Sequence, residues 1–465
     1  GGAGLFMLNM LQDAEKHLSA IPGVLVAKSQ GTLLTEQYGK NFFEGPQIHE
    51  KSPTRFLPEG NNIAVYGSVA GRATFRSEVV STVISPVVEE VCGVPQQWGK
   101  PQFQPSWKPW QASLQYSSCP SIGIEGNLLI KAVEDYKKPL LDIVTKFGDL
   151  RTQIKPLSEM ATVCGLDGVR FIDKMKPTTA VGYPLTGAKS EYITELDPDD
   201  FPDWNCPQEL DSMFWDEAQK MKDLYLDGQR AYPIFKASLK DEPTSLSKDK
   251  VRVFQAAPVA FQLLIRQYFL PIARVFSLFP LISECAVGVN ASGPEWNQLA
   301  CHMKKYGDDR ILAGDYSKYD LRMSCQLISV AFRVMIDMAE ESLNYSSDDI
   351  EIMKGIATDV SQPVMAYNGD YIQHVGSNPS GQNLTVYINS IVNSILFRCA
   401  YFDIYKEWTS PPPFREVCAL MTYGDDAKGS VKEGYDEFNH VSVADFLGSR
   451  DIKFTMPDKE SEPVP

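Results

Sequence analysis

Two adjacent aspartates, Asp425 and Asp426, follow Tyr423 and Gly424 where the sequence predicts a hairpin over residues 417–431. The hairpin begins with a short apolar run at 417–420, and three prolines at 411–413 interrupt the chain before it. Carboxylates at neighbouring positions repel each other, so both stay ionised only beside a counter-charge or a metal ion. The chain must therefore fold so that this hairpin tip meets a cation.

A third aspartate ends another predicted strand. Residues 311–315, ILAGD, are typical of a short buried strand that ends in Asp315, and Asp320 follows five positions later. Taken alone, an aspartate at a strand end is more often a helix cap. If this strand pairs with the hairpin, however, Asp315 lies beside Asp425 and Asp426. Such a group of hard oxygen ligands suits Mg²⁺, and two such ions can stabilise an in-line phosphoryl displacement.

A tight loop at residues 376–381, GSNPSG, precedes a predicted helix. The apolar face of this helix contains Leu384, Ile388, Ile391, Val392 and Ile395. Beside that face runs a polar stripe at i, i+4 and i+8, formed by Thr385, Asn389 and Asn393. The stripe is either a solvated side of the helix or a set of amides and hydroxyls that recognise a sugar hydroxyl, and the sequence leaves both open.

The formal net charge is −15, with 59 acidic and 44 basic residues. This balance speaks against nucleic-acid binding, which usually leaves a basic footprint, so any such function needs local positive charge. Residues 235–254 supply it, because they contain Lys236, Lys240, Lys248, Lys250 and Arg252 among acidic residues. The segment is either an exposed mixed-charge hairpin or, placed over a metal site, a receiver for a triphosphate.

The remaining composition is that of a globular protein. The 465 residues are 43% hydrophobic, and no apolar run approaches the length of a membrane span. The nine cysteines form no C-x-x-C pair, which argues against a zinc site or disulfide framework and suits a reducing compartment. Alternating strand and helix patterns predict an α/β or α+β core.

Three further segments carry structural predictions. Residues 126–147 and 209–228 have the pattern of helices. Residues 94–120 are rich in proline and tryptophan, which predicts an irregular segment held to the surface by its rings.

Six segments, in chain order, resemble the motifs of RNA-dependent RNA polymerases of picornavirus-like positive-strand RNA viruses (Picornavirales), with marnaviruses and dicistroviruses as candidate groups. The segments TTAVGYP (178–184) and KDEP with KDKVR (240–243 and 248–252) are similar to the template-entry and nucleotide-entry motifs. DYSKYD (315–320) and GSNPSGQNLTVYIN (376–389) resemble the first two palm motifs. YGDD (423–426) and FTMPDKES (454–461) resemble the two that follow.

The resemblance implies roles for single residues. Asp315 and Asp425 would bind both metal ions, Mg²⁺ or Mn²⁺, with Asp426 in support. Lys459 would protonate the leaving pyrophosphate. The residues implied in binding the nucleotide are Asp320 and Asn389 for the ribose, assisted by Ser380 and Thr385, and Lys240, Lys248 and Arg252 for the triphosphate. The residues implied in binding the template are Thr178, Thr179, Gly182, Tyr183 and Pro184.

The implied fold is α+β: a right-hand polymerase of fingers, palm and thumb, with an antiparallel palm sheet flanked by helices. The expected divisions are an upstream polyprotein tail or N-terminal extension at 1–75, fingers at 76–275, palm at 276–350, a fingers insertion at 351–378 and palm again at 379–465. A thumb would follow the segment of Lys459. Because the sequence stops at Pro465, we expect the thumb to be missing from it.

The resemblance also implies partners. These are an RNA template and product duplex, ribonucleoside triphosphates, other viral replication proteins and a protein primer, although no residue here establishes the primer. The implied location is the host cytoplasm, at membrane-associated replication complexes, without a transmembrane segment in this chain.

Two rival functions remain. A reverse transcriptase shares the palm and a Y-x-D-D hairpin, but Asp320 with Asn389 suits accepting a 2′-hydroxyl rather than excluding it. A non-enzymatic acidic scaffold predicts no ordered metal affinity and no ordered series of motifs.

Overall fold

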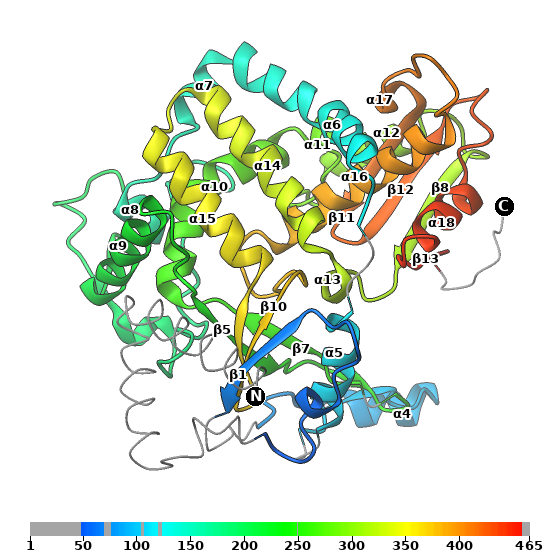
Figure 1. The fold of residues 1–465 in the computed structure, drawn as a ribbon. Coiled ribbons are helices and arrows are strands. Elements are labelled where there is room, and N and C mark those ends of the chain that lie inside the picture. The colour runs from blue at the N-terminus through cyan, green and yellow to red at the C-terminus, as the bar shows by residue number, and fades with distance from the viewer. Residues whose placement is uncertain (1–47, 69–75, 104–106, 120–122, 249, 458–465) are drawn as a thin grey trace, which may run out of the picture.

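Two β-sheets organise the part of the chain that the computed structural model describes, which is residues 48–68, 76–103, 107–119, 123–248 and 250–457. A four-stranded sheet lies at the right of Figure 1, and a five-stranded sheet lies at the lower centre. Helices pack around both sheets, and the sheets are mostly antiparallel. This architecture confirms the α+β expectation.

The four-stranded sheet has the order β11-β12-β8-β13, and all its neighbours are antiparallel. Its strands are β8 (Ile311–Tyr316), β11 (Cys418–Tyr423), β12 (Asp426–Val431) and β13 (Phe454–Thr455). The predicted strand ending near Asp315 and the predicted 417–431 hairpin are both confirmed. They also pair directly, because β12 lies between β11 and β8.

The central helix of this half, α16 (Thr385–Ile404), contacts β11 on one side and α6 (Gly126–Lys146) on another. Every residue from 388 to 401 is buried, so the helix has no solvated face along that stretch. The other helices around this sheet are α11 (Pro280–Ser283), α12 (Pro294–Met303), α13 (Tyr319–Arg322), α14 (Cys325–Ser342), α17 (Phe414–Val417) and α18 (His440–Gly448).

The five-stranded sheet has the order β1-β10-β9-β5-β7, in which only the β5–β9 pair is parallel. Its strands are β1 (Ile63–Ser68), β5 (Ile234–Leu239), β7 (Val253–Ala256), β9 (Val364–Tyr367) and β10 (Asp370–His374). β1 comes from the segment expected to be an N-terminal extension. That segment is anchored further by the buried Asp370, whose carboxylate accepts hydrogen bonds from Ser52 (2.6 Å) and Thr54 (3.3 Å). Residues 52–68 are therefore part of the folded body. The expected division at residue 75 does not mark the edge of that body.

The remaining described elements are two short strand pairs and nine helices, which lie around the two sheets and the helices already described. Two short two-stranded pairs join β2 (Trp98–Gly99) to β6 (Thr244–Ser245) and β3 (Ile193–Glu195) to β4 (Gln208–Leu210). The helices are η1 (Pro53–Phe56), α4 (Ser85–Cys92), α5 (Lys108–Ser117), α7 (Gly148–Gln153), α8 (Glu159–Cys164), η2 (Lys189–Tyr192), α9 (Ser212–Leu226), α10 (Val259–Leu278) and α15 (Ser347–Ser361).

The predicted helices at 126–147 and 209–228 are confirmed as α6 and α9. The prediction of an irregular segment over 94–120 is wrong for residues 108–117, which form α5. Pro109 lies in the first turn of α5, where a helix tolerates proline because the amide there has no intrahelical partner. All nine cysteines are free.

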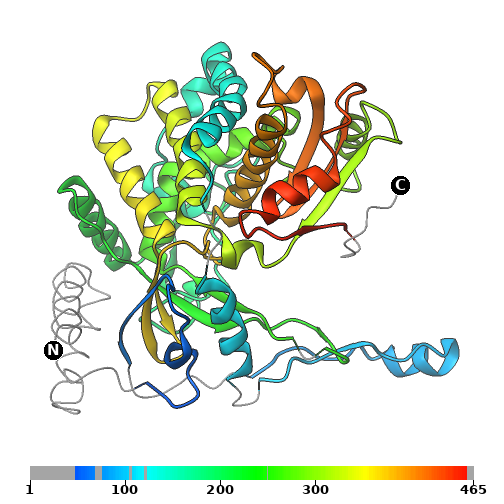
Figure 2. The same ribbon diagram turned by 45° about the vertical axis from the view of Figure 1, so that its right-hand side comes forward.

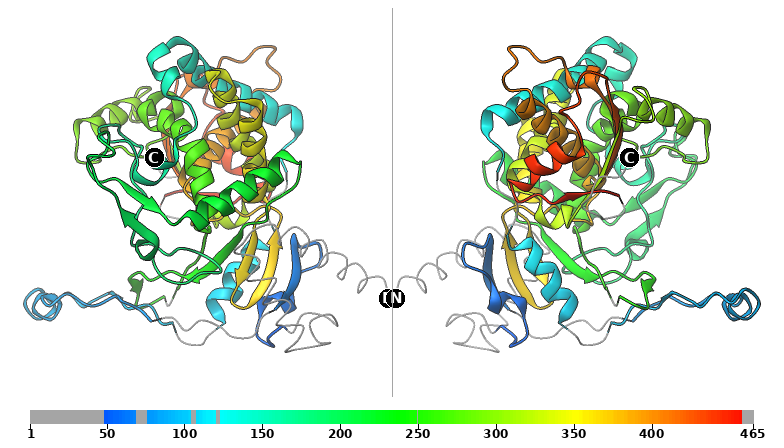
Figure 3. Two further views of the ribbon diagram at one scale, coloured as in Figure 1. Left: turned by 90° about the vertical axis from the view of Figure 1, so that its left-hand side faces the viewer. Right: turned by 90° about the vertical axis from the view of Figure 1, so that its right-hand side faces the viewer.

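One helix in the described part of the chain, α10, is long and apolar enough to cross a membrane by length and composition alone. In this fold 83% of that window is buried inside the protein, as in the core helix of a globular body. A thin arm with α4 at its tip projects away from that body (Figures 2 and 3). No residue of α4 is buried.

Candidate active site

The hairpin tip is a two-residue turn, Gly424-Asp425, closed by the pairing of Tyr423 with Asp426. Gly424 has a φ of 59°, and turns of this length require a positive φ at their first central position. Residues 418–422 are all buried, so β11 runs out of the core and ends where Tyr423 becomes exposed. The tip is thus held rigidly from behind and open at the front.

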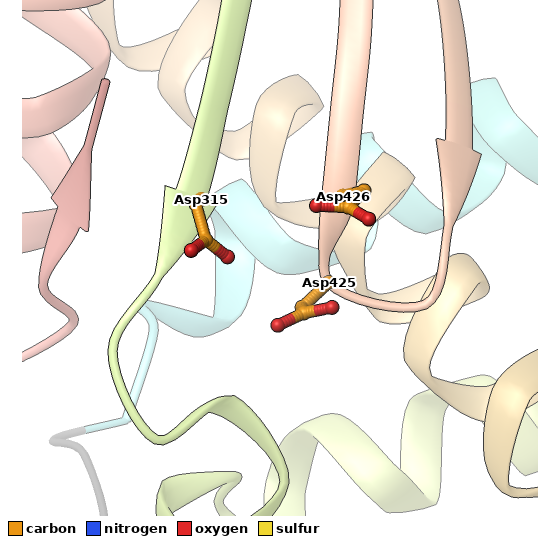
Figure 4. A group of neighbouring side chains, drawn as sticks. All are labelled: Asp315, Asp425 and Asp426. Atoms are coloured by element: carbon orange, nitrogen blue, oxygen red, sulfur yellow. The ribbon is translucent and has the colours of Figure 1, made fainter. Parts of the chain in front are cut away.

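The register of β8 on β12 brings the third aspartate level with the tip. Gly314 pairs with Ala427, so Asp315 and Asp426 are the next positions along the antiparallel pair. One carboxylate oxygen from each of Asp315, Asp425 and Asp426 lies within 4.8 Å of the others. Figure 4 shows the three side chains around the gap between the end of β8 and the turn. The predicted cluster is therefore present.

Phe454 on β13 fixes the other face of β8. A Cβ atom at Gly314 would lie 1.9 Å from the Phe454 ring, so only glycine leaves room for this ring. The ring also packs against Tyr316, with centroids 5.1 Å apart. The segment before Lys459 thus braces the strand that carries Asp315, while Lys459 itself lies outside the described residues.

The three carboxylates lack a protein cation. Burial, together with the charges of Asp315, Asp426 and Asp320, raises the pKa of Asp425 to about 6. Burial and Asp315 also raise the pKa of Asp426. Among the ion pairs of the described residues, none involves Asp315, Asp425 or Asp426. Repelling oxygen ligands at one point fit a hard divalent cation, which would remove the repulsion.

Asp320 and Asn389 are in contact, as the ribose assignment requires. The Asn389 side-chain amide donates to Asp320 Oδ1 at 2.7 Å. Its oxygen accepts a bond of 2.9 Å from Asn378, which orients the amide. Burial raises the pKa of Asp320 to about 6, although the Asn389 bond and the charge of Arg252 oppose the rise. The sequence analysis did not identify Asn378 as a site residue, because the only signal for it was its position in the 376–381 loop.

The polar stripe on α16 is not a solvated side of the helix. Asn389 is 6% exposed and Asn393 is fully buried, so that alternative is wrong. The Thr385 hydroxyl donates to the Pro379 carbonyl at 2.7 Å and thereby shapes the loop. Ser380 donates to Gln255 Oε1 on β7 from its amide and its hydroxyl, both at 3.3 Å. A direct contact of Ser380 or Thr385 with ribose stays a prediction.

Gly381 allows the loop to dock on the five-stranded sheet. Its backbone forms a bridge with Ala256, and a Cβ atom there would lie 2.0 Å from the Gln255 carbonyl oxygen. The close approach, rather than an unusual φ, is the reason for glycine. It places the loop and Asn378 at the junction of the two sheets.

The predicted triphosphate cations lie on the β5–β7 hairpin, which confirms an exposed mixed-charge segment. Arg252 makes two bonds to the Glu242 carboxylate, at 2.6 and 2.8 Å, and Lys240 lies 3.5 Å from the same group. The structure therefore places two of the three cations on Glu242, a partner that the sequence analysis did not identify. Lys248 is exposed, and its backbone amide donates to Ser245.

The predicted template residues form a compact loop over the start of α10. The Val259 amide donates to the Val181 carbonyl, and a Cβ atom at Gly182 (φ 86°) would lie 2.7 Å from Pro258. The hydroxyl of Tyr183, which precedes the cis Pro184, bonds to that of Tyr371 on β10. Thr178 and Thr179 are exposed.

A buried lysine that the sequence analysis missed supports this loop. Lys189 Nζ donates to Thr179 Oγ1 at 2.5 Å and to the Ala180 carbonyl at 3.2 Å. Burial lowers the pKa of Lys189 to about 8. In sequence it is one lysine among many, so only the folded loop reveals its position.

A buried ion network supports β11 from behind. Arg398 of α16 is fully buried and makes bonds of 2.6 and 3.1 Å to Glu284 and of 2.9 Å to Asp135. The Glu284 carbonyl in turn accepts the amide (2.7 Å) and the hydroxyl (2.8 Å) of Thr422, two residues before Gly424. Breaking such a buried pair typically costs ~3–5 kcal/mol. The hairpin that carries Asp425 and Asp426 is thus tied to the core of the protein.

Comparison with known proteins now identifies the class. A solved structure, the Sicinivirus 3Dpol RNA-dependent RNA polymerase, superimposes with a TM-score of 0.63 at 18% identity, over 86% of this chain and 77% of that one. The fold is therefore that of a right-hand polymerase, as the sequence predicted. We accordingly call the four-stranded sheet the palm sheet and the five-stranded sheet the fingers sheet.

The model of the viral RNA-dependent RNA polymerase family matches residues 130–464, and this chain belongs to that family. The genome polyprotein of Deformed wing virus is 26% identical over 72% of this chain, and the replicase polyprotein of Drosophila C virus (strain EB) is 22% identical over 97%. The chain spans 12% and 27% of the lengths of those two polyproteins. The resemblance to picornavirus-like polymerases is confirmed.

Proposed function

We propose that this chain synthesises RNA on an RNA template from ribonucleoside triphosphates, by two-metal-ion nucleotidyl transfer, and so replicates a viral RNA genome. The observation that carries the proposal is the cluster of Asp315, Asp425 and Asp426, with oxygens within 4.8 Å of one another. Family membership and the polymerase fold support it.

In the proposed reaction the 3′-oxygen of the growing strand bonds to the α-phosphorus, and the bond from that phosphorus to pyrophosphate breaks. Asp315 and Asp425 would hold the Mg²⁺ or Mn²⁺ ions, and Asp426 would support them. Such ions supply charge stabilisation for the attacking and leaving oxygens. The hydroxyl proton passes to solvent, and Lys459 gives a proton to the leaving pyrophosphate.

Recognition of ribose falls to Asp320 and Asn389. Their mutual bond uses one oxygen of Asp320, which leaves acceptor positions on the carboxylate for a 2′-hydroxyl. A deoxyribonucleotide would leave those buried acceptors unpaired, which costs free energy. This pair is the observation that favours an RNA polymerase over the rival, a reverse transcriptase.

Recognition of the triphosphate falls to Lys240, Lys248 and Arg252. Glu242 holds two of these cations, and its single charge is weaker than that of a triphosphate. We therefore expect the incoming nucleotide to replace Glu242 as the partner of Arg252. Ser380 and Thr385 would assist indirectly, through the loop that they shape.

The remaining parts of the proposal concern RNA and partners. The template would cross Thr178, Thr179, Gly182, Tyr183 and Pro184, and the product duplex would leave past the palm sheet. The relatives are genome or replicase polyproteins, which supports joint action with other viral replication proteins. A protein primer is part of the proposal through the motif resemblance alone. We also propose membrane-associated replication complexes in the host cytoplasm as the location, which fractionation of infected cells would test.

The test measures single-turnover incorporation on a primed RNA template with Mg²⁺ or Mn²⁺ and either ribo- or deoxyribonucleotides. We expect ribonucleotide incorporation by the wild type and only background incorporation by Asp315→Asn and Asp425→Asn, with Asp426→Asn impaired less. Incorporation by Asp425→Asn within a few-fold of wild type would reject the metal assignment. Preferred use of deoxyribonucleotides would support the reverse transcriptase instead.

A further inference from the structure

Asn393, the third member of the polar stripe, has no role in the proposed reaction, yet it contacts the elements that carry the aspartates. It is fully buried in α16, two helical turns after Thr385. Its amide nitrogen donates to the Gly424 carbonyl at 3.0 Å and to the Asp426 carbonyl at 3.2 Å. Its oxygen accepts a bond of 2.9 Å from the Tyr316 hydroxyl.

The chemistry of the partners fixes the direction of all three bonds. Backbone carbonyls only accept hydrogen bonds, so the nitrogen of Asn393 must face Gly424 and Asp426. The oxygen then faces Tyr316, and the tyrosine hydroxyl must donate. No isosteric residue reproduces this pattern, because aspartate lacks the donors and leucine lacks all polar atoms.

The three bonds reach both sides of the aspartate cluster. Gly424 and Asp426 are the neighbours of Asp425 in the turn, and Tyr316 is the neighbour of Asp315 on β8. Ser390, one helical turn before Asn393, accepts a bond of 2.9 Å from the Gly424 amide. The same helix therefore holds the Gly424 peptide units at N–H and C=O while one of its side chains also holds β8.

We propose that Asn393 is a positioning residue that sets the separation of Asp315 and Asp425, and with it the geometry offered to a divalent cation. This inference rests on the proposed function, in which those two carboxylates bind the metal. The carboxylates repel each other and stand on different elements. The pairing of β12 with β8 ends at Ala427 and Gly314, so beyond that pair the bonds of Asn393 limit movement of the two-residue turn away from β8. Mg²⁺ demands nearly ideal octahedral geometry, so a small displacement weakens its binding.

The first readout is the binding of Mn²⁺, measured by electron paramagnetic resonance in the absence of RNA and nucleotide. Residues that orient metal ligands typically contribute 10–100-fold to metal affinity. We expect Asn393→Ala to raise the Mn²⁺ dissociation constant by at least ~10-fold. The matched control is Ser394→Ala on the same helix, since Ser394 is fully buried and its hydroxyl has no hydrogen-bond partner. The control should bind Mn²⁺ as the wild type does.

The second readout is incorporation. Asn393→Ala should lower kcat and raise the metal concentration for half-maximal rate, while the KM for the ribonucleotide stays within about twofold, because Asn393 does not contact the nucleotide site. If Asn393 had a purely structural role, Asn393→Ala would lower the thermal midpoint. The molecules that remain folded would then reach half-maximal incorporation at the same metal concentration as the wild type. That result would overturn the inference.

A second variant covers the case in which Asn393→Ala fails to fold. Tyr316→Phe removes only the hydroxyl and keeps the ring that packs on Phe454. Tyr316→Phe should also weaken Mn²⁺ binding. The double variant Tyr316→Phe with Asn393→Ala should bind Mn²⁺ about as weakly as Asn393→Ala alone, because both substitutions remove the same bond between Tyr316 and Asn393. Mn²⁺ affinity within twofold of wild type for Tyr316→Phe and every folded Asn393 variant would overturn the inference.

The two proposals fail in different ways. If the wild type binds Mn²⁺ in a manner that Asp425→Asn abolishes, yet incorporates no nucleotide, the proposed function is wrong and Asn393 is still judged on Mn²⁺ affinity. If Asp425→Asn binds Mn²⁺ as well as the wild type does, both proposals are wrong.

Discussion

At the scale of single residues, the site is built from groups that oppose one another until a ligand arrives. Asp315, Asp425 and Asp426 repel one another, and Glu242 pairs with two of the cations for which we propose a triphosphate partner. Each local conflict is tolerated because the surrounding elements are fixed. Two of the residues that fix these elements, Asn393 and Arg398, are buried and polar, and their hydrogen bonds lie on the side of the site that faces the core.

The repulsion predicts an effect on stability. In a buffer with a chelator at pH 8, Asp425→Asn should unfold at a temperature equal to or above that of the wild type, because it removes one of three repelling charges. The sign agrees with the raised pKa of Asp425: a carboxyl with a folded pKa near 6 destabilises the fold above that pH. Adding Mg²⁺ should raise the midpoint of the wild type and leave that of the variant unchanged. Calorimetry with and without Mg²⁺ would measure these midpoints. A variant that is less stable than the wild type in chelator would contradict the prediction.

The Asp320–Asn389 bond predicts the choice of sugar. Asn389→Ala should lower the ratio of ribo- to deoxyribonucleotide incorporation, mostly by slowing the former, with a cost of ~1–3 kcal/mol. Asn378→Ala should cause a smaller change, because it removes only the bond that orients Asn389. Competition assays with both nucleotides give the ratio directly. An unchanged ratio in Asn389→Ala would remove this residue from ribose recognition.

At the scale of elements, the sequence correctly predicted those strands and helices whose formation depends on a local residue pattern. The strand before Asp315, the hairpin and helices α6 and α9 follow from periodicity and turn chemistry, and pairing β8 with β12 then brings the aspartates together. The polar stripe on α16 stayed undecided, because its burial depends on α6 and the palm sheet, which lie far away in sequence. β1 was missed because a single short strand has no pattern of its own and becomes stable only beside β10.

The docking of the 376–381 loop on the fingers sheet predicts a steric effect. Gly381→Ala places a Cβ atom against the Gln255 backbone, which cannot rotate away as a side chain can. The loop must shift, so the KM for ribonucleotides should rise several-fold through Asn378 and Asn389. Gly126→Ala is the matched control, since nothing lies within 4 Å of a Cβ atom there. Equal KM values for the two variants would show that the loop does not depend on this contact.

The junction of β10 with β1 predicts a pH effect. Burial lowers the pKa of His374, at the end of β10, to about 4, and its Nδ1 atom has no hydrogen-bond partner. Below pH 6.5 the unfolded chain takes up a proton that the folded chain refuses, so the free energy of unfolding falls as pH drops from about 6.5 to 4. Urea titrations across this range should show a weaker dependence for His374→Gln than for the wild type. Parallel curves would contradict the prediction.

At the scale of the whole molecule, an acidic protein concentrates its functional contacts at the junction of two sheets. The palm sheet supplies carboxylates, and the β5–β7 hairpin of the fingers sheet supplies cations, so the net charge of −15 describes neither surface. The ordered motifs were sufficient to predict the class of enzyme. The partners of those motifs, such as Glu242, Asn378 and Lys189, could be found only after folding, because each is an ordinary polar residue in sequence.

The arm that ends in α4 has a consequence on the timescale of amide hydrogen exchange. An eight-residue helix without buried residues gains nothing from packing, and isolated helices of this length are marginal in water. Its amides should exchange with deuterium within seconds, almost as in an unfolded peptide, whereas those of residues 388–401 in α16 should exchange only when the whole domain opens. Mass spectrometry of pepsin fragments would measure both in one experiment. If the amides of α4 were as protected as those of α16, the arm would have to be covered in solution, and the expectation of fast exchange would be wrong.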